Sequence, residues 1–289
     1  MFDRLANSWR LIKYSATVLK KDTELLVFPL ISGIAALLVL ASFILLFIQT
    51  PESEDETINM LVVGGFYLVE YFVMFFFNSA LVGAAMIRMD GGNPGIGDGL
   101  RIAWSKVGQI FGYALVAATV GMLLRFVGRR FGFVGRLIAG LSGVAWTVAS
   151  YLAVPILVSR DVGPLDAIKE SVSLLKKTWG ENLIVSGGLG LVFNLVYIVL
   201  VGLLLFTAGS AFAASQIELA IGIVSAGVLM LLLTGLMQAA MQGIFSTALY
   251  RFATDGQVSE DFSPQVLSNA FAPKDRFISA TNQQRPPIS

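Results

Sequence analysis

Six long stretches of apolar residues, separated by short polar segments, dominate the chain. A helix needs about 20 apolar residues to cross the roughly 30 Å hydrocarbon layer of a membrane. The stretches lie near residues 25–49, 59–87, 107–124, 137–158, 183–208 and 218–249. They are too long for barrel strands, and lipid requires the backbone to be hydrogen-bonded within each segment. The pattern therefore predicts an all-α polytopic membrane protein with six transmembrane helices.

A short pattern recurs ahead of these stretches. Residues 11–21 read LIKYSATVLKK and residues 167–177 read AIKESVSLLKK, and a fainter copy at 100–106 places Ile102 and Ser105 in the matching positions. Because each copy precedes two spans, we predict three parallel repeats of an amphipathic helix followed by a transmembrane hairpin. The predicted repeats cover approximately residues 1–91, 92–163 and 164–256 of a single membrane domain, 1–253.

Each predicted repeat also ends in a similar way. The three endings are Arg88-Met-Asp90-Gly91, Arg160-Asp161-Val-Gly163, and Arg251 followed by Asp255-Gly256. From about residue 254 the chain turns polar, and we predict a cytoplasmic tail over 254–289 that is partly disordered.

The amphipathic segments predict helices that lie at the membrane interface or dock against the ends of the bundle. In the third, helical spacing predicts an apolar face of Leu165, Ile168, Val172, Leu175 and Trp179. In the second, the predicted face is Ile96, Leu100, either Ala103 or Trp104, and Val107. Trp and basic side chains suit headgroup depth. The candidate headgroup contacts are Trp9, Lys13, Lys20, Lys21, Trp104, Lys106, Arg129, Arg130, Lys176, Lys177 and Trp179.

The distribution of Lys and Arg predicts which side of the membrane each polar segment faces. All but four of the 20 Lys and Arg residues fall in segments that share one side if every stretch crosses, which predicts that both termini are cytoplasmic. The opposite side holds an acidic loop at 52–56. The four exceptions are Arg125, Arg129, Arg130 and Arg136. Either this loop binds anionic lipid headgroups, or the third and fourth stretches form a shallow re-entrant pair.

Composition narrows the possible chemistry. Hydrophobic residues make up 56% of the chain and charged residues 13%, against about 25% charge in soluble domains. The chain has neither Cys nor His, which removes thiolate chemistry, the usual general base and the commonest metal ligand. The net charge of +1 argues against a nucleic-acid partner. We therefore expect no cofactor, no metal and no enzymatic activity, with membrane lipids as partners and a membrane protein or a second copy as a further possibility.

The opening segment resembles a known family. Residues 9–29, from Trp9-Arg-Leu-Ile-Lys13 to Phe28-Pro29, resemble an uncharacterised family of prokaryotic multi-span proteins, and the resemblance covers most of residues 1–275. The repeated unit is also similar in pattern to the membrane domain attached to some glycerophosphodiester phosphodiesterases, although no phosphodiesterase domain is present. The family resemblance implies a multi-pass protein of the cytoplasmic (inner) membrane and supplies no catalytic residues.

Six polar residues form a candidate intramembrane site. Glu70 is the one carboxylate well inside a stretch, and an intramembrane ionisable group is a functional hypothesis by default. Asn78 lies two helical turns further along roughly the same face, and Arg125 could pair with Glu70. The other candidates are Asn194, Gln238 and Gln242. The last two are four residues apart and face one way, although interhelical hydrogen bonding is the commoner use of such groups.

Two functions remain open. The first is a structural or accessory protein that organises lipids or partner proteins, and it predicts a sealed core. The second is a transporter or channel-like protein for a small solute, ion or lipid that uses Glu70, and it predicts a cavity near mid-membrane. The sequence favours the first, because only one charge lies deep within the stretches.

Overall fold

The computed structural model describes residues 15–49, 56–179 and 188–256, and every regular element within these ranges is helical. Residues 15–21 form a helical segment that precedes the first labelled element. The elements that follow are η1 (Thr23–Leu26), α2 (Val27–Gln49), α3 (Glu56–Met89), α4 (Ile96–Ser105), α5 (Val107–Arg130), α6 (Gly132–Ala149), α7 (Ala153–Ser159), α8 (Pro164–Trp179), α9 (Gly188–Ala213) and α10 (Ile217–Asp255).

Within the described residues, which are all-α in their regular structure, six helical stretches are long and apolar enough to cross a membrane, as the sequence predicted. They are Thr23–Ile48, Leu61–Met89, Val107–Arg130, Gly132–Ser159, Phe193–Ala213 and Ile217–Asp255. The third is longer than predicted, since α5 continues to Arg130 rather than ending near 124. Residues 183–187 of the predicted fifth span lie outside the described residues.

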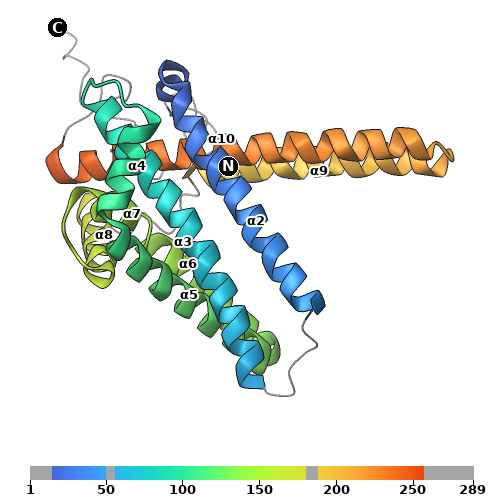
Figure 1. The fold of residues 1–289 in the computed structure, drawn as a ribbon, viewed down its shortest axis with the longest axis horizontal. Coiled ribbons are helices and arrows are strands. Elements are labelled where there is room, and N and C mark those ends of the chain that lie inside the picture. The colour runs from blue at the N-terminus through green and yellow to red at the C-terminus, as the bar shows by residue number, and fades with distance from the viewer. Residues whose placement is uncertain (1–14, 50–55, 180–187, 257–289) are drawn as a thin grey trace, which may run out of the picture.

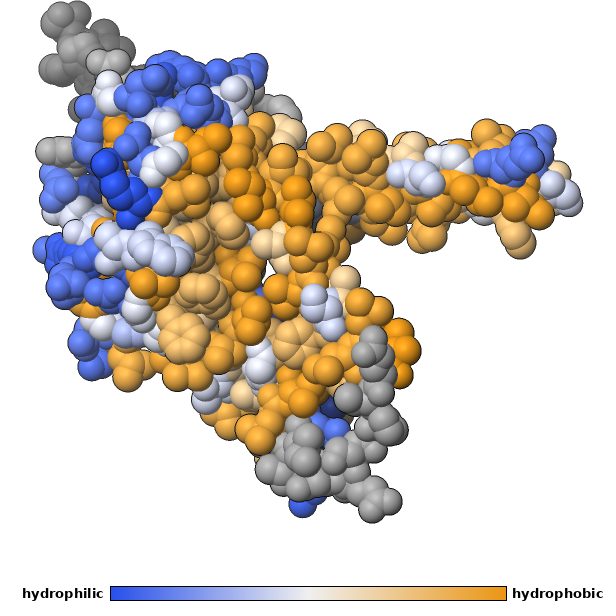
Figure 2. All heavy atoms as spheres, viewed as in Figure 1, coloured by the Kyte–Doolittle hydropathy of each residue, from blue (hydrophilic) through white to orange (hydrophobic). Residues whose placement is uncertain are grey.

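The spans pair into three hairpins, α2–α3, α5 with α6 and α7, and α9–α10 (Figure 1). The first two hairpins run side by side, and α3 contacts both α2 and α5. The third hairpin diverges from them and projects away from the bundle. The face of this hairpin seen in Figure 2 is apolar along most of its length and hydrophilic near its tip. This exterior suits lipid, because apolar surface of this extent is rarely left open to water.

The packed core lies at one end of the bundle. Three stretches, 79–85 in α3, 152–158 in and before α7, and 243–250 in α10, contain only buried residues. Each stretch is followed within three residues by an arginine, namely Arg88, Arg160 or Arg251. We call this region, marked by these three arginines and Lys106, the charged end. The hairpins are thus held together at the charged end and separate away from it.

Each of the three arginines joins its hairpin to another part of the protein. Arg88 donates a hydrogen bond to the Lys21 carbonyl (3.4 Å). Arg251, at the end of α10, forms an ion pair with Asp90 after α3. Arg160 pairs with Glu170 of α8 at 2.6 Å. A hydrogen bond with Tyr250 of α10 is the main cause that raises the pKa of Arg160. The charged end is therefore cross-linked by polar contacts as well as by packing.

The buried face of α8 differs from the predicted one. Ala167, Ser171 and Leu175 are the buried residues, whereas the predicted Leu165 and Val172 are 58% and 44% exposed. The prediction assumed that the largest apolar residues face the protein. The prediction is right for Leu175, which is buried, and in part for Ile168, which is half-buried and packs against the core. Ala167 and Ser171 complete the buried face, because small residues allow α8 to pack closely, while lipid offers Leu165 and Val172 an apolar environment.

The helix of the predicted middle repeat shows the same preference for small buried residues. Ser15 and Ser171 are fully buried, but Ser105, which the sequence pattern matched to them, is exposed. Ala103 takes the buried position instead, while Trp104 is 70% exposed. The burial of Ser105 therefore does not follow the alignment predicted from Ser15 and Ser171. Of the two residues proposed for the apolar face at this point, Ala103 is the one that faces the protein.

Candidate binding cavity

The fourth span is interrupted inside the membrane-spanning region. The sequence predicted one continuous helix over 137–158, but α6 ends at Ala149 and α7 begins at Ala153. Pro155 explains the break. It has no N–H to donate to the carbonyl four residues earlier, that of Tyr151, and its ring clashes with a helical carbonyl there. Within the first turn of α7 the same proline is tolerated.

A side chain from another helix satisfies the backbone at this break. Tyr151 N donates to the Val148 carbonyl (3.2 Å), so Leu152 N cannot use it in the ordinary helical way. Leu152 N instead donates to Ser171 Oγ of α8 at 3.1 Å, in a buried contact. Irregular backbone at membrane depth is stable only where protein or a cavity covers it. Ser171 supplies that cover on one side.

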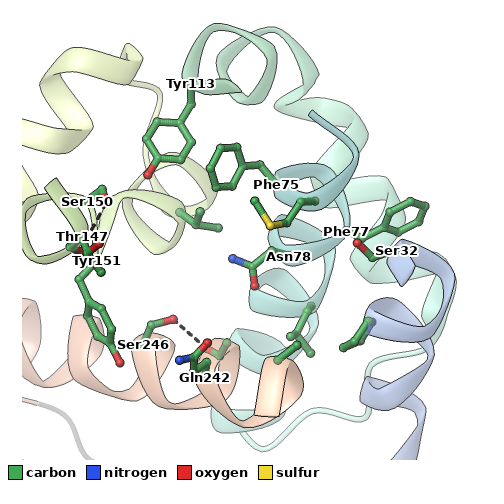
Figure 3. A pocket seen from close by; sticks show the side chains of 16 residues that line it. Ser32, Phe75, Phe77, Asn78, Tyr113, Thr147, Ser150, Tyr151, Gln242 and Ser246 are labelled. Atoms are coloured by element: carbon green, nitrogen blue, oxygen red, sulfur yellow. Dashed lines mark hydrogen bonds between the residues drawn. The ribbon is translucent and has the colours of Figure 1, made fainter. Parts of the chain in front are cut away.

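A cavity lies on the other side of the break. Its volume is about 340 Å³, and helices from all three hairpins line it (Figure 3). Its polar lining is uncharged and consists of hydroxyl and carboxamide groups, from Ser32, Asn78, Tyr113, Thr147, Ser150, Tyr151, Gln242 and Ser246. In Figure 3 the Asn78 and Tyr113 side chains point into this space. The centroids of Phe75 and Tyr113 are 4.5 Å apart, so ring contact helps to position Tyr113.

The cavity lies, along the helices, about half of a membrane's hydrocarbon thickness from the charged end. Asn78 lies ten residues before Arg88 in α3, and Gln242 lies nine residues before Arg251 in α10. At 1.5 Å per helical residue these intervals correspond to about 14–15 Å, roughly half of the hydrocarbon thickness. Tyr151 lies nine residues before Arg160. All three hairpins thus place a polar residue of their second arm at one level.

Three hydroxyls in the cavity have hydrogen-bond partners in the protein, whereas the carboxamides have none within the described residues. Thr147 Oγ1 donates to the Gly143 carbonyl (2.9 Å), Ser150 Oγ to the Trp146 carbonyl (2.8 Å) and Ser246 Oγ to a carbonyl of its own helix. Over residues 15–49, 56–179 and 188–256, no protein partner hydrogen-bonds the side chain of Asn78 or Gln242. A carboxamide that has no hydrogen-bond partner in an apolar environment destabilises the protein by about 1–3 kcal/mol, judged from mutational data. These two amides are therefore available to a guest molecule.

The cavity is closed toward the charged end and open toward the hairpins. The buried stretches begin at Ser79 and Gly243, next to Asn78 and Gln242, and continue to the charged end. On the other side, Met74 beside the cavity is 45% exposed, and Met237 of α10 is 49% exposed. Access to the amides therefore runs along apolar, lipid-facing surface between the hairpins.

Glu70 and Arg125 lie away from this cavity. Among the described residues the structure gives Glu70 no ion pair, and the predicted pairing with Arg125 is not formed. The Arg125 guanidinium instead lies 4.7 Å from the centroid of the Tyr67 ring, a cation–π geometry. Of the six candidate polar residues, Asn78 and Gln242 meet at the cavity. Asn194 is exposed and Gln238 half-buried, each outside its lining.

The candidate headgroup contacts divide into three groups. Seven are exposed, namely Lys20, Lys21, Trp104, Arg129, Arg130, Lys176 and Lys177. Lys106 is engaged within the protein, since its ammonium group pairs with Asp161 (3.4 Å) and donates to the Arg160 carbonyl (3.3 Å). Trp9, Lys13 and the side chain of Trp179 lie outside the described part of the chain.

Sequence reasoning missed the hydroxyl side of the cavity. Tyr113, Ser150 and Tyr151 were not singled out, because a Ser or Tyr within an apolar stretch is common. Counting back nine or ten residues from Arg88, Arg160 and Arg251 would have found Tyr151 at the level of Asn78 and Gln242.

Comparison with known proteins identifies a family for this chain, but that family has no known activity. The model of a family of unknown function (DUF6159) matches residues 57–260, which is more than half of the chain. The match supports the predicted relationship to an uncharacterised family, although residues 9–29, which suggested it, lie outside the matched segment. No curated protein and no solved structure matches the chain.

Proposed function

Because the chain belongs to this family of unknown function, which supplies no activity, we propose a function from the cavity alone: a non-catalytic membrane protein that binds an amphipathic lipid with an uncharged polar head. The head would occupy the cavity and hydrogen-bond the carboxamides of Asn78 and Gln242. The chain would lie between the diverging hairpins. The lipid-organising role that the sequence favoured is kept, but the cavity departs from the sealed core that the sequence analysis predicted for that role.

The observation that carries the proposal is the pair of carboxamides without a protein partner at mid-membrane depth. A hydroxyl in the head could both donate to the amide oxygens and accept from the amide N–H groups, and a carbonyl could accept from the N–H groups, whereas hydrocarbon can do neither. The uncharged lining disfavours a charged head, because desolvating a charge without a counter-charge is costly. The closure toward the charged end and the apolar approach favour a ligand that arrives from lipid rather than from water.

The pattern of the second arms supports the repeat arrangement as part of this proposal. In each arm a polar residue that lines the cavity is followed by a buried stretch and then by an arginine. The polar residues are Asn78, Tyr151 and Gln242. We infer one binding site built by three related hairpins around an axis along the membrane normal. The concentration of Lys and Arg favours placing the charged end and both termini in the cytoplasm of the inner membrane.

Photo-crosslinking tests the lipid proposal. The purified protein in nanodiscs would be exposed to a diazirine-bearing diacylglycerol and, separately, to a diazirine-bearing phosphatidylglycerol. We expect diacylglycerol adducts on peptides that line the cavity, lowered at least about fivefold in Asn78→Leu/Gln242→Leu, because two hydrogen bonds are lost. Gln238→Leu is the matched control, since Gln238 lies one turn away on the same helix and outside the cavity lining. Labelling that the double variant leaves unchanged would contradict the proposal.

A second candidate is transport of a small uncharged solute, favoured by the interrupted span. Broken helices beside a mid-membrane cavity are how many transporters build their sites. This reading keeps the earlier transporter hypothesis but moves its polar site from Glu70 to Asn78 and Gln242. Stopped-flow measurements of glycerol and urea entry into proteoliposomes separate the two candidates. Entry no faster than in protein-free liposomes would exclude these solutes and leave the lipid proposal standing.

A further inference from the structure

The turn between α5 and α6, at the end opposite the charged end, carries a second cluster of unusual composition (Figure 1). One residue, Phe131, separates the two helices. Gly132 has a positive φ of 57°, and a Cβ at Gly135 would lie 2.3 Å from the Val127 carbonyl oxygen. These glycines allow the helices to reverse direction within a very short turn. The tight turn brings Arg129, Arg130 and Arg136 to a single tip.

This tip is basic, and its own hairpin offers it no counter-charge. The sequence contains no Asp or Glu between Asp98 and Asp161. Within the described ranges no carboxylate pairs with Arg129, Arg130 or Arg136, and all three side chains are exposed.

Apolar side chains are interleaved with these arginines. Phe131 is 61% exposed, Phe133 75% and Val134 61%. Aromatic residues next to basic ones are typical of surfaces that lie at the boundary between headgroups and acyl chains. A tip destined for bulk water would not expose three large apolar residues in four positions.

The length of α5 places the tip at the far membrane surface. Its 24 residues correspond to about 36 Å, somewhat more than the hydrocarbon thickness, so the helix can extend from Lys106 to the opposite interface. A shallow re-entrant pair would not need helices of this length. The four arginines of this hairpin would then lie on the side where the positive-inside rule disfavours them.

We infer that the tip formed by Arg129, Arg130 and Arg136 binds the phosphate groups of anionic phospholipids in the leaflet opposite the charged end. Guanidinium groups bind phosphate oxygens through paired hydrogen bonds. Zwitterionic and anionic phospholipids both carry such a phosphate. The net charge selects the anionic lipid, because a zwitterionic headgroup presents its own cation to the arginines. Phe131 and Phe133 would enter the acyl region beside that lipid. This site is separate from the cavity and does not depend on the function proposed for it.

The chain has no cysteine, so one introduced cysteine gives a unique label. Phe133→Cys would carry a bimane fluorophore at the tip, and Phe212→Cys, 70% exposed near the tip of the third hairpin, would carry it at a matched position without nearby arginines. The protein would be reconstituted with nitroxide-labelled phosphatidylglycerol or nitroxide-labelled phosphatidylcholine at equal mole fraction. The ratio of quenching by the two lipids reports local enrichment of the anionic one.

At position 133 we expect labelled phosphatidylglycerol to quench the fluorophore at least about twofold more strongly than labelled phosphatidylcholine. At position 212 we expect the two lipids to quench it equally. Arg129→Gln/Arg130→Gln/Arg136→Gln should bring the ratio at 133 to about one, while the triple Lys variant should keep most of it. If the Gln variant does not fold, raising salt from about 50 to about 500 mM should lower the ratio in the unmodified tip. A ratio of one at 133 with all arginines present would overturn the inference and point to the acidic residues at 52–56 as the neutralising partner.

Discussion

The second arms of the second and third hairpins perform the same task with different backbones. Both place a polar residue at the cavity, follow it with a buried stretch and end in an arginine that makes an ion pair. Yet α10 is one helix of 39 residues, whereas the arm formed by α6 and α7 is broken between Ala149 and Ala153. Counting back five residues from each arginine gives Pro155 in one arm and Ser246 in the other. The broken arm therefore has a proline where the continuous arm has a serine.

The comparison also shows what a broken span requires. A proline in the interior of a helix costs about 3 kcal/mol, and more where the freed groups stay buried. In the broken arm α8 supplies Ser171 as acceptor for Leu152 N. In α10, Ser246 donates to the Gly243 carbonyl at 3.0 Å within its own helix. The break is thus a joint property of Pro155 and α8, and it turns Tyr151 and Ser150 toward the cavity.

A proline placed in α10 should have the largest effect on stability. Ser246→Pro should lower the free energy of unfolding by about 3 kcal/mol or more, because the buried helix loses a hydrogen bond and gains a steric clash. The apparent midpoint of thermal unfolding in detergent would report the loss. Ser246→Ala, which keeps the helix, should change the midpoint little. A proline variant as stable as the alanine variant would show that the continuity of α10 is not what stabilises this arm.

Removing the acceptor at the natural break should have the next largest effect. Ser171→Ala leaves Leu152 N buried without a partner, which should cost about 1–3 kcal/mol. The chain offers a matched control in Ser15, which is equally buried but whose hydroxyl has no hydrogen-bond partner within the described residues. Ser15→Ala should therefore be nearly neutral in the same unfolding measurement. Equal losses in the two variants would mean that burial of the serine, and not its bond to Leu152, is what matters.

The sequence could predict the spans but not the break between α6 and α7. Length and apolarity determine whether a stretch can cross lipid, and both are properties of a single segment. Whether Pro155 kinks a helix or begins a new one depends on an acceptor from α8, which no local pattern contains. The same limit applies to burial. A Cβ at Gly99 would lie 2.5 Å from the Phe28 ring, so packing between α4 and the bundle selects small residues rather than the most apolar ones.

The cavity could be predicted only in part for a related reason. Asn78 and Gln242 stood out as polar residues in apolar stretches, but Glu70, Asn194 and Gln238 stood out equally. Their direction around each helix depends on how the hairpins pack, and lipid removes the usual rule that large apolar residues face inward. Only the spacing to Arg88, Arg160 and Arg251 distinguished the cavity level, and that signal appears only when the second arms of all three hairpins are compared.

The smallest expected effects concern the ion pairs that end the two arms. Asp90→Asn and Glu170→Gln should each cost about 0.2–1 kcal/mol, because each pair has a partly exposed partner and the amide retains hydrogen-bonding capacity. The difference from the unmodified protein should shrink in high salt. Arg251→Gln should cost more than Asp90→Asn, since Arg251 also donates to the Met86 carbonyl (3.4 Å) and links the third hairpin to the first. If Asp90→Asn were as damaging as Ser171→Ala, the charged end would be held by ionic pairing rather than by its buried stretches. The α10 arm would then be stabilised mainly by its ion pair, whereas the arm formed by α6 and α7 is stabilised by the bond from Leu152 to Ser171.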